Sequence, residues 1–560
     1  MIGIDLGTTN SLVAILRDGQ PVTLKNELGE DLIPSVVAVA EDGTLLVGRA
    51  AKDRLVTCPG AGQSCFKRDM GTDATYEFGG RKWSPVECSA LVLRELKRIA
   101  EVELKTTVDS AVITVPAYFH DQQRQATVDA AAIAGLKVLR LLNEPTAAAL
   151  AYGYRATDDL NTLLVFDLGG GTFDVTLLES FEGVVEVKAS SGESRLGGED
   201  YTDAFAQWIE RELNWSPPAG DALRWRERVE MLKRELSKQT HTTITLSGKE
   251  APISRDDFIT ATADITARLR PVVRRAMRDA GLTPKQIDAV LLVGGASRMP
   301  VVFEDLRDLL GMEPSRTLDP DRVVALGAAV QQALVAGDAA VKDLVLTDVC
   351  PHTLGIETTK ELVRGHREHG FFAPIIERNT MVPCSRSECY STLSPEQDEL
   401  AIQVYQGESR LVKDNRHIGK LLIKGLRARS GQKFPGLVDV RFSYDMNGIL
   451  EVEVTIKESG KKMSKVFEQR PGTLSAEQIA AALRILQPLK TNLADLPENR
   501  ARTERANRLY ADLSGEMRRS LEVFLEAFEA ALISQERGRV VDAARDLDSF
   551  MAPFFRDNDG

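Results

Sequence analysis

The chain has 560 residues, 27% of them charged and 43% hydrophobic, and its formal net charge is −12. This length exceeds what one hydrophobic core usually organises and predicts about three or four domains. The acidic balance, without a clustered field of Lys and Arg, argues against a protein that binds nucleic acid.

The cysteines and the first strand indicate the cellular compartment in which we expect the protein. Six cysteines are scattered without a CxxC pair, so we expect reduced thiols rather than a zinc site or a disulfide framework. An apolar strand begins at Ile2, which leaves no room for a signal peptide, and no apolar run reaches the ~18 residues of a membrane span. We therefore expect a cytoplasmic protein without membrane contact.

Periodicity divides the chain into unequal parts. Residues 1–342 alternate apolar strands with helical stretches, which predicts an α/β domain. Residues 343–350 hold a short apolar segment between two aspartates, interpreted as a linker too short to be a domain element. Residues 351–471 alternate with period two and contain an Asn447-Gly448 hairpin signal, which predicts a β-domain. Residues 472–560 return to helical spacing, with one apolar stripe predicted over Met517, Leu521, Phe524, Phe528 and Leu532.

The opening stretch "MIGIDLGTTN" ends a strand in an acidic, glycine-lined turn. Gly7 lets the backbone turn tightly, so that amides and the hydroxyls of Thr8 and Thr9 face one point, where phosphate oxygens would fit. Asp5 beside phosphates suits Mg²⁺ and its retained waters. A hairpin turn without any ligand explains a single such stretch equally well.

"LVFDLGGGTFD" repeats the arrangement around Asp167. Three consecutive glycines, Gly169 to Gly171, weaken any regular element and favour a close approach of the backbone to a partner. The two copies stand about 160 residues apart, each at the head of an α/β stretch. They predict duplicated lobes whose hairpins grip one polyphosphate from opposite sides. No P-loop is present, and no G-x-G-x-x-G follows the first strand.

A third glycine turn, in "LLVGGASRMP", carries Gly294, Gly295, Ser297 and Arg298. A base or ribose could stack and hydrogen-bond there, although an ordinary strand-to-helix turn has the same pattern.

The strings "GIDLGTTNS", "VITVPAYFHDQQRQAT", "LLNEPTAAALAYGY", "FDLGGGTFDVTLL", "LLVGGASRMP" and "DPDRVVALGAAVQQAL" together resemble the seventy-kilodalton heat-shock chaperones, the DnaK-like family, in order along the chain. The short chain and its divergent C-terminal half look most similar to the HscC-type branch. The resemblance implies an actin-like ATPase domain, a β-sandwich substrate domain and a short α-helical lid. It also implies ATP or ADP with Mg²⁺ and K⁺ as cofactors.

The resemblance assigns the catalytic chemistry residue by residue. Asp5 and Asp167 match the residues that organise Mg²⁺ through water, and Lys67 matches the catalytic lysine. Without the family, Lys67 would be taken as an exposed solubilising side chain. The matching catalytic and phosphate-binding residues are Glu144, Thr172, Asp174, Gly7, Thr8, Thr9, Asn10, Gly170 and Gly171. Those matching the adenosine site are Glu230, Lys233, Arg234, Ser237, Gly294, Gly295, Ser297, Arg298 and Asp321. A solvated helix face is the alternative for the group on the helix around Glu230.

The second half of the function rests on the linker and the β-domain. The apolar Leu344, Val345 and Leu346 should dock on the ATPase domain in one state and be released in the other. By resemblance, Arg140, Pro116, Arg124 and Asp348 belong to the interdomain or J-domain co-chaperone contacts.

The residues implied for an extended apolar peptide are Leu354, Ile356, Tyr390, Leu393, Leu400 and Ile402. Core packing is the alternative for each of them. Leu400 stands where relatives usually have a smaller valine, so the peptide preference should be narrow or unusual. The second lobe lacks much of the longer hairpin that relatives have, which leaves open the need for a nucleotide-exchange factor. The competing class is an actin-like filament protein or sugar kinase, which would need no β-domain with a helical cap.

Overall fold

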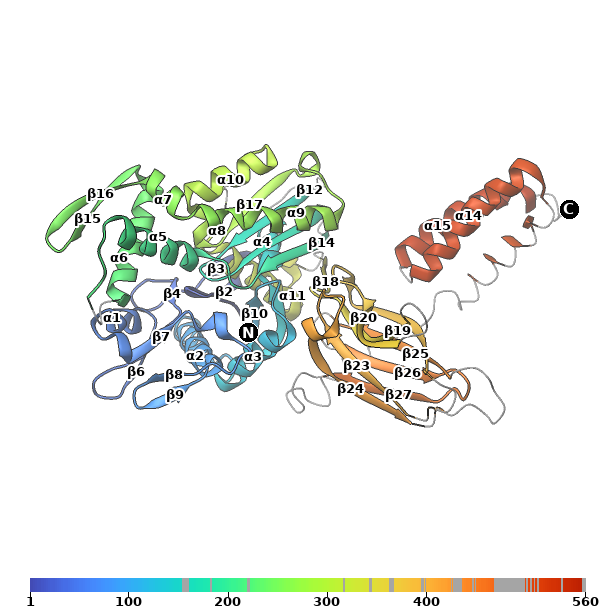
Figure 1. Cartoon of the computed structure of the whole chain (residues 1–560), viewed down its shortest axis with the longest axis horizontal. Helices are drawn as coiled ribbons and strands as arrows, with labels where there is room; N and C mark the ends of the chain where they lie inside the picture. The colour runs from blue at the N-terminus through green and yellow to red at the C-terminus, as the bar shows by residue number, and fades with distance from the viewer. Residues whose placement is uncertain are drawn as a thin grey trace.

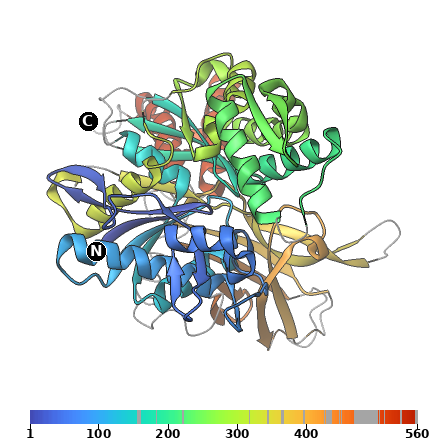
Figure 2. The same ribbon diagram turned by 90° about the vertical axis from the view of Figure 1, so that its left-hand side faces the viewer.

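The computed structural model describes most of the chain (Figure 1). The residues outside the description are 154–160, 182–183, 219–221, 316–317, 342–344, 362–366, 394–396, 398, 425, 427–435, 446–447, 449, 468–498, 500–501, 504–505, 508, 511–512, 535–536 and 556–560. Two α/β lobes lie one above the other, the first largely blue and the second largely green, in both Figure 1 and Figure 2.

The first lobe is built on a sheet in which β1 has a parallel neighbour, β10, and an antiparallel neighbour, β2. The strands, in order across the sheet, are β11 (Lys137–Asn143), β10 (Ser110–Val115), β1 (Ile2–Leu6), β2 (Asn10–Arg17) and β3 (Gln20–Thr23), with β4 (Ile33–Pro34) paired to β2. Ile2, Ile4 and Leu6 share one face and pack on α2 (Pro85–Leu104) and α3 (Asp121–Ile133). The opposite face lies against α11 (Val323–Ala336), because a Cβ on Gly3 would stand only 2.5 Å from the backbone of Ala328.

Smaller elements complete this lobe. They are β5 (Val36–Val39), β6 (Leu45–Val47), α1 (Arg49–Thr57), η1 (Pro59–Ala61), β7 (Gly62–Ser64), η2 (Phe66–Asp69), β8 (Tyr76–Phe78) and β9 (Arg81–Trp83).

The second lobe repeats the plan of the first. Its sheet runs in the order β17 (Ala289–Val293), β12 (Asn161–Leu168), β13 (Phe173–Phe181), β14 (Val184–Glu193), β18 (Val345–Val349) and β21 (Met381–Val382). The β12–β13 hairpin corresponds to the β1–β2 hairpin, so the predicted duplication of an acidic hairpin within an α/β sheet is confirmed. One face packs on α9 (Leu269–Ala280), and the other on α4 (Glu144–Gly153).

Further helices and a hairpin cap the second lobe. They are α5 (Gly198–Glu212), α6 (Ala222–Lys238), β15 (His241–Leu246), β16 (Lys249–Ser254), α7 (Arg255–Ala261), α8 (Ala263–Ala267), η3 (Pro284–Gln286), η4 (Gly295–Arg298), α10 (Pro300–Leu310) and η5 (Ala339–Val341). Helices α4 and α11 cross closely between the two sheets, since a Cβ on Gly327 would lie 1.7 Å from the carbonyl oxygen of Ala147.

Part of the segment interpreted as a linker forms strand β18 (Val345–Val349), which lies along the edge of the second lobe. In β18, Val345 pairs in parallel with Val184 of β14, and Leu346 packs on the cluster beneath α4. The edge of β14 offers unpaired backbone groups, so an extended apolar segment satisfies its own N–H and C=O groups there. Leu344 lies outside the described residues.

The predicted β-domain is confirmed as two sheets packed face to face. One sheet has the order β20 (Arg367–Ile376), β19 (Leu354–Glu361), β23 (Glu399–Gln406) and β24 (Arg416–Lys424). The other has the order β22 (Cys384–Ser391), β25 (Leu437–Tyr444), β26 (Leu450–Ile456) and β27 (Lys462–Phe467), and η7 (Val412–Asp414) precedes β24. Ile402 and Val404 of the predicted alternating run lie in the shared core. Strands β25 and β26 flank the predicted hairpin turn, of which Asn447 lies outside the described residues.

At the C-terminal end, α14 (Gly515–Ser534) and α15 (Arg537–Phe555) pack together as the predicted helical unit. Leu521, Phe528 and Leu532 of the predicted stripe are buried, and Phe524 is partly buried. Met517 is 54% exposed, because it lies in the first turn of α14, before Leu521, the first buried position of the stripe. No helix in the described part of the chain is long and apolar enough to cross a membrane.

Candidate functional site

The two acidic hairpin turns meet face to face between the lobes. A Cβ on Gly170 would lie 2.0 Å from Oγ1 of Thr9, and one on Gly171 would lie 2.8 Å from the methyl group of Thr8. Only glycine fits both positions, so the turn of β12–β13 approaches the turn of β1–β2 as closely as backbone allows. Within the first turn, a Cβ on Gly7 would stand 2.1 Å from the carbonyl oxygen of Asn10.

Three aspartates lie near these turns between the lobes, a region called here the cleft; Asp167 and Asp174 are buried and Asp5 is partly buried. Asp5 ends β1 and accepts a hydrogen bond from the Thr114 hydroxyl (2.8 Å), while Asp167 and Asp174 stand opposite each other in the β12–β13 ladder. Burial, reinforced by the nearby Glu144, raises the pKa of Asp5 and of Asp174 to about 7 and that of Asp167 well above its usual range. Oδ2 of Asp167 has no hydrogen-bond partner among the described residues. The cleft therefore holds more buried carboxylates than its own cations neutralise.

Lys67 supplies the cation at the centre of this group. It belongs to η2, is 4% exposed, and its Nζ lies 2.6 Å from Oε1 of Glu144. Glu144 opens α4 directly after β11, where the helix N-terminus favours a carboxylate. Thr172 is buried in the β12–β13 turn, so the predicted catalytic residues of both lobes are gathered around one cleft.

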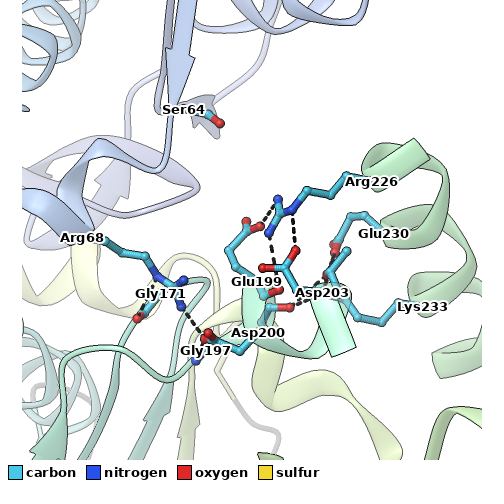
Figure 3. Close-up of polar contacts among 12 residues, drawn as sticks. Ser64, Arg68, Gly171, Gly197, Glu199, Asp200, Asp203, Arg226, Glu230 and Lys233 are labelled. Atoms are coloured by element: carbon cyan, nitrogen blue, oxygen red, sulfur yellow. Dashed lines mark hydrogen bonds and ion pairs between the residues drawn. The ribbon is translucent and has the colours of Figure 1, made fainter. Parts of the chain in front are cut away.

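The residues expected at the adenosine side cluster on α6 and η4. The Nζ of Lys233 reaches the carbonyl oxygen of Gly198 (2.8 Å), Oγ1 of Thr202 (2.7 Å) and Oε2 of Glu230 (2.5 Å), as Figure 3 shows in part. Arg234 is mostly exposed and donates to Glu230, and the hydroxyl of Ser237 donates to the carbonyl of Lys233.

Gly198 also brings η4 to the same place. A Cβ on Gly198 would stand 3.1 Å from Cβ of Ala296 and 3.6 Å from Nζ of Lys233. Gly294 has a positive φ of 79° and lies against the carbonyl of Leu168, which a side chain would meet at 2.4 Å.

The rest of η4 faces a pair of carboxylates. Arg298 is held by Asp319 (2.5 Å) and Asp321 (2.8 Å), and the Ser297 hydroxyl donates to the carbonyl of Gly294. The two halves of the expected adenosine site are thus neighbours.

Ion pairs across the mouth of the cleft were not found by sequence reasoning. Arg68 of the first lobe pairs with Asp200 of the second and donates to the carbonyl of Gly171 (Figure 3). Asp69 accepts from Arg195 at 3.3 Å. The only signal in the sequence was the pair of opposite charges that directly follows Lys67.

A further charged group lies on the second-lobe side of the mouth. Arg226 of α6 pairs with Glu199 and with Asp203 (2.7 Å), both on α5 (Figure 3). These contacts fix the side of α5 from which Asp200 reaches Arg68.

The residues expected at the interdomain contact form a connected network. Arg124 of α3 donates to Oδ1 of Asn143 (2.6 Å) and to the carbonyl oxygens of Ala117 and Phe119, and Nδ2 of Asn143 donates to Oδ2 of Asp348 (2.8 Å). Burial raises the pKa of Asp348.

Two other expected members lie beside this network. Arg140 is largely buried near Asp348, and its Nε has no hydrogen-bond partner among the described residues. The carbonyl of Pro116 accepts from Phe119 in the turn before α3.

The β-sandwich also contacts the second lobe directly. Arg378 pairs with Asp279 of α9 at 2.8 Å, and Oδ1 of Asn379 accepts from the backbone N–H of Ser190 at 3.0 Å. A cavity of about 510 Å³ lies beside these contacts and is lined by residues of α9 and of the loops after β20 and β23. The sandwich is therefore docked on the lobes.

The residues expected to line a peptide cleft are divided. Leu354, Ile356 and Ile402 are at most 3% exposed and belong to the core between the two sheets. Tyr390 and Leu400 are partly buried against that core, and Leu393 is 42% exposed. In the docked arrangement, only the last three present a surface that a peptide could reach.

The fold and the site define a two-lobed protein that closes over a buried acidic cleft and carries a docked β-sandwich. A family model described as Hsp70 protein matches residues 1–78 and 72–551, so the chain belongs to the Hsp70 family. It is accordingly an ATP-dependent chaperone and an ATPase, which binds ATP or ADP with Mg²⁺ and takes unfolded peptides as substrates. Members of the family commonly work with J-domain co-chaperones.

The match also distinguishes between the two classes of protein left open by the sequence, a chaperone and an actin-like filament protein or sugar kinase. It continues through the β-sandwich and most of α15, which an actin-like filament protein or a sugar kinase does not need.

The cleft fits a hydrated magnesium ion. The partnerless oxygen of Asp167 and the raised pKa values of Asp5 and Asp167 show a place where added positive charge would be stabilising. No group of three or more His, Cys, Asp or Glu residues in the described part of the chain is arranged to hold a metal directly. Contact through the ion's retained waters, which Mg²⁺ gives up reluctantly, suits this geometry.

Proposed function

We propose that the nucleotide bound between the lobes controls how tightly the β-sandwich holds extended apolar peptide segments. One observation carries the proposal: β18 pairs with β14 of the second lobe and, through Asp348 and Val349, with β21, the short strand that directly precedes β22 of the sandwich. A movement of the second lobe that disturbs the edge of β14 therefore changes the anchorage of the sandwich. Coupling of this kind is typically worth ~1–3 kcal/mol.

A second route connects the cleft to the sandwich through backbone contacts. Oδ1 of Asp174 accepts from the N–H of Tyr118 (3.2 Å), and the carbonyl of Tyr118 lies 3.3 Å from Nε2 of His352, three residues after β18. A change in charge or position at Asp174 therefore reaches the first residues of the β-sandwich through a single intermediate residue.

For hydrolysis, we assign Lys67 to the γ-phosphate, with Thr172 beside it and the turns around Gly7 and Gly170 enclosing the phosphate chain. Lys67 neutralises phosphate charge, and the carboxylates of Glu144 and Asp174 orient the attacking water and accept its proton. When bound through Asp5 and Asp167, Mg²⁺ supplies the additional positive charge that phosphoryl transfer to water requires.

On the adenosine side, we assign Glu230, Lys233, Arg234 and Ser237 of α6 together with Gly295, Arg298 and Asp321. Support comes from Gly198, which brings Lys233 and η4 to one place. K⁺ is proposed as a second cation of the cleft by family resemblance.

The other partners follow from the same resemblance. We propose a J-domain co-chaperone that acts through Arg140, Arg124, Pro116 and Asp348, a docked segment that includes Leu344, and an exchange factor whose need stays open. We also propose that the chain belongs to the HscC-type branch and that it is located in the cytoplasm with free thiols. The proposed domain bounds are 1–342, 343–350, 351–471 and 472–560.

The test measures release of a fluorescent apolar peptide from the full chain with and without Mg-ATP. Release should accelerate on addition of Mg-ATP and remain slow with Mg-ADP. An unchanged release rate, in protein that binds both ATP and peptide by calorimetry, would show that the two sites are not coupled.

A further inference from the structure

Two imidazoles and a guanidinium meet where the β-sandwich touches the first lobe. His120 directly precedes α3, His352 follows β18 by three residues, and Arg416 opens β24 of the sandwich. His352 is 8% exposed and packs edge-on against the ring of Tyr118, with ring centroids 4.5 Å apart. This contact, called here the histidine junction (His120, His352 and Arg416), exists only while the sandwich is docked.

The hydrogen bond between His120 and Arg416 fixes the protonation state of His120. Nη1 of Arg416 lies 2.8 Å from Nδ1 of His120. A guanidinium can only donate, so Nδ1 must offer its lone pair and the ring must be neutral, with its proton on Nε2. Protonation of His120 would replace this interdomain hydrogen bond with two cations in contact.

The surroundings of both rings also oppose a positive charge. Burial and the neighbouring Arg416 and Arg124 lower the pKa of His120 to about 4, and burial lowers that of His352 to about 3. The N-terminus of α3 adds the positive end of a helix dipole beside His120.

The charged and titratable groups that face the two rings from the packed elements are Arg124, Arg416 and Tyr118. Carboxylates of the neighbouring segments are engaged by other groups, Asp174 by the N–H of Tyr118, Asp348 by Asn143 and Glu408 by Thr353.

We propose that the histidine junction makes docking of the β-sandwich on the ATPase lobes sensitive to proton concentration, so that mild acid releases the sandwich. The inference rests on the proposed function in that docking must be reversible. The proton acts here as a ligand that binds the undocked chain and is excluded from the docked one.

The sign and size of the effect follow from linkage. Once undocked, both rings return to water, where a histidine has a pKa of about 6.5. The docked state binds fewer protons, so docking is fully favoured above about pH 6.5 and is lost as the pH falls below it. Between pH 7.5 and 6.0 the docking equilibrium should weaken about fourfold for each ring and about 15-fold for both.

Hydrogen exchange of the β18 backbone amides reports this equilibrium even when undocking is rare. The full chain is incubated with Mg-ATP at pH 7.5 and 6.0, and the exchange is corrected for the intrinsic effect of pH by reference to β10. The protection of β18 should fall about 15-fold in the wild type, by the same linkage. His120→Asn keeps an acceptor near the position of Nδ1 but does not titrate, so the protection of β18 in this variant should fall only about fourfold. In the double variant His120→Asn with His352→Leu, the protection should not depend on pH.

His417→Asn is the matched control, because His417 is exposed on the same strand β24 and bonds to Gln403. Its response to pH should equal that of the wild type. A wild type whose β18 protection is independent of pH overturns the inference, and so does a double variant, or His120→Asn alone, that keeps the full pH response. If the protection of β18 responds to pH but is the same with Mg-ADP as with Mg-ATP, the proposed function is contradicted and the inference about the histidine junction stands.

Discussion

The Nζ of Lys67 and Oε1 of Glu144 are 2.6 Å apart, and both side chains are less than one tenth exposed. The pair comes from η2 and from the first residue of α4, which are 77 positions apart in the chain. Asp5, Asp167 and Asp174 lie near this pair, and the positive charge of Lys67 partly offsets the rise in their pKa values that burial causes.

We expect Lys67→Ala to reduce ATP hydrolysis by about 100-fold or more, because the variant lacks the charge at the γ-phosphate. ATP binding should stay measurable by calorimetry, since the turns and α6 are unchanged. Lys82→Ala is the control, because Lys82 is exposed and pairs only with Glu77. Single-turnover hydrolysis at the wild-type rate in Lys67→Ala would contradict the assigned role.

Gly170→Ala should weaken ATP binding by about tenfold or more, equivalent to about 1.4 kcal/mol. The added methyl group would lie 2.0 Å from Oγ1 of Thr9 and force the two turns apart. Gly60→Ala is the matched control, since a Cβ there meets nothing within 4 Å and no positive φ is required. Equal ATP affinity of the two variants by calorimetry would refute a shared phosphate cradle.

Arg68→Ala should accelerate nucleotide release about two- to fivefold, because an ion pair across the cleft mouth contributes up to about 1 kcal/mol. Stopped-flow measurement with a fluorescent nucleotide gives the rate. Arg54→Ala removes an ion pair with Glu41 that lies entirely within the first lobe, and should leave the rate unchanged. If both variants release nucleotide at the same rate, the pair of Arg68 with Asp200 does not hold the lobes together.

Asn143→Ala should reduce the acceleration of peptide release by ATP about fivefold or more, a loss within the usual range of coupling energies. The variant breaks the hydrogen bonds to both Arg124 and Asp348, and so loosens β18 from the first lobe. Asn26→Ala, in a surface turn of the same lobe, is the control. Release that responds to ATP as in the wild type would place the coupling elsewhere.

Leu400→Val should broaden the peptide preference of the sandwich. Leu400 is partly buried on β23, and removal of one methylene group opens space worth about 0.8 kcal/mol, or about fourfold in affinity, to a large apolar peptide side chain. Binding of leucine-containing and valine-containing peptides is compared by fluorescence anisotropy. Leu422→Val, 44% exposed on the adjacent strand, should change neither affinity. A leucine peptide bound no better by Leu400→Val would remove this residue from the pocket.

Sequence patterns were sufficient where the physical cause is local. Period-two alternation around Ile402 and helical spacing around Leu521 predicted a β-domain and a helical unit correctly, because burial of one face imposes that spacing on any strand or helix. The repeated acidic turn indicated two lobes. In each copy the turn leaves no space for a Cβ, so glycine is needed at both Gly7 and Gly170.

Local patterns failed where distant segments decide the outcome. Lys67 looks like a surface lysine until η2 is placed against α4, and Met517 has the spacing of a core residue but lies beyond the buried part of its helix. Residues 343–350 were interpreted as a linker whose apolar residues dock on the ATPase domain, but nothing in those residues reveals that the contact is strand pairing with the edge of β14.

The sequence by itself determined the family and the order of lobes, sandwich and helices, and it predicts which residues hold a magnesium nucleotide. Only the tertiary structure decided that β18 joins the sheet of the second lobe, that Arg68 reaches Asp200, and that His120 meets Arg416. The reason is that alternation, turns and caps depend on neighbours along the chain, whereas these contacts join residues more than 100 positions apart and exist only after the lobes and the sandwich have packed.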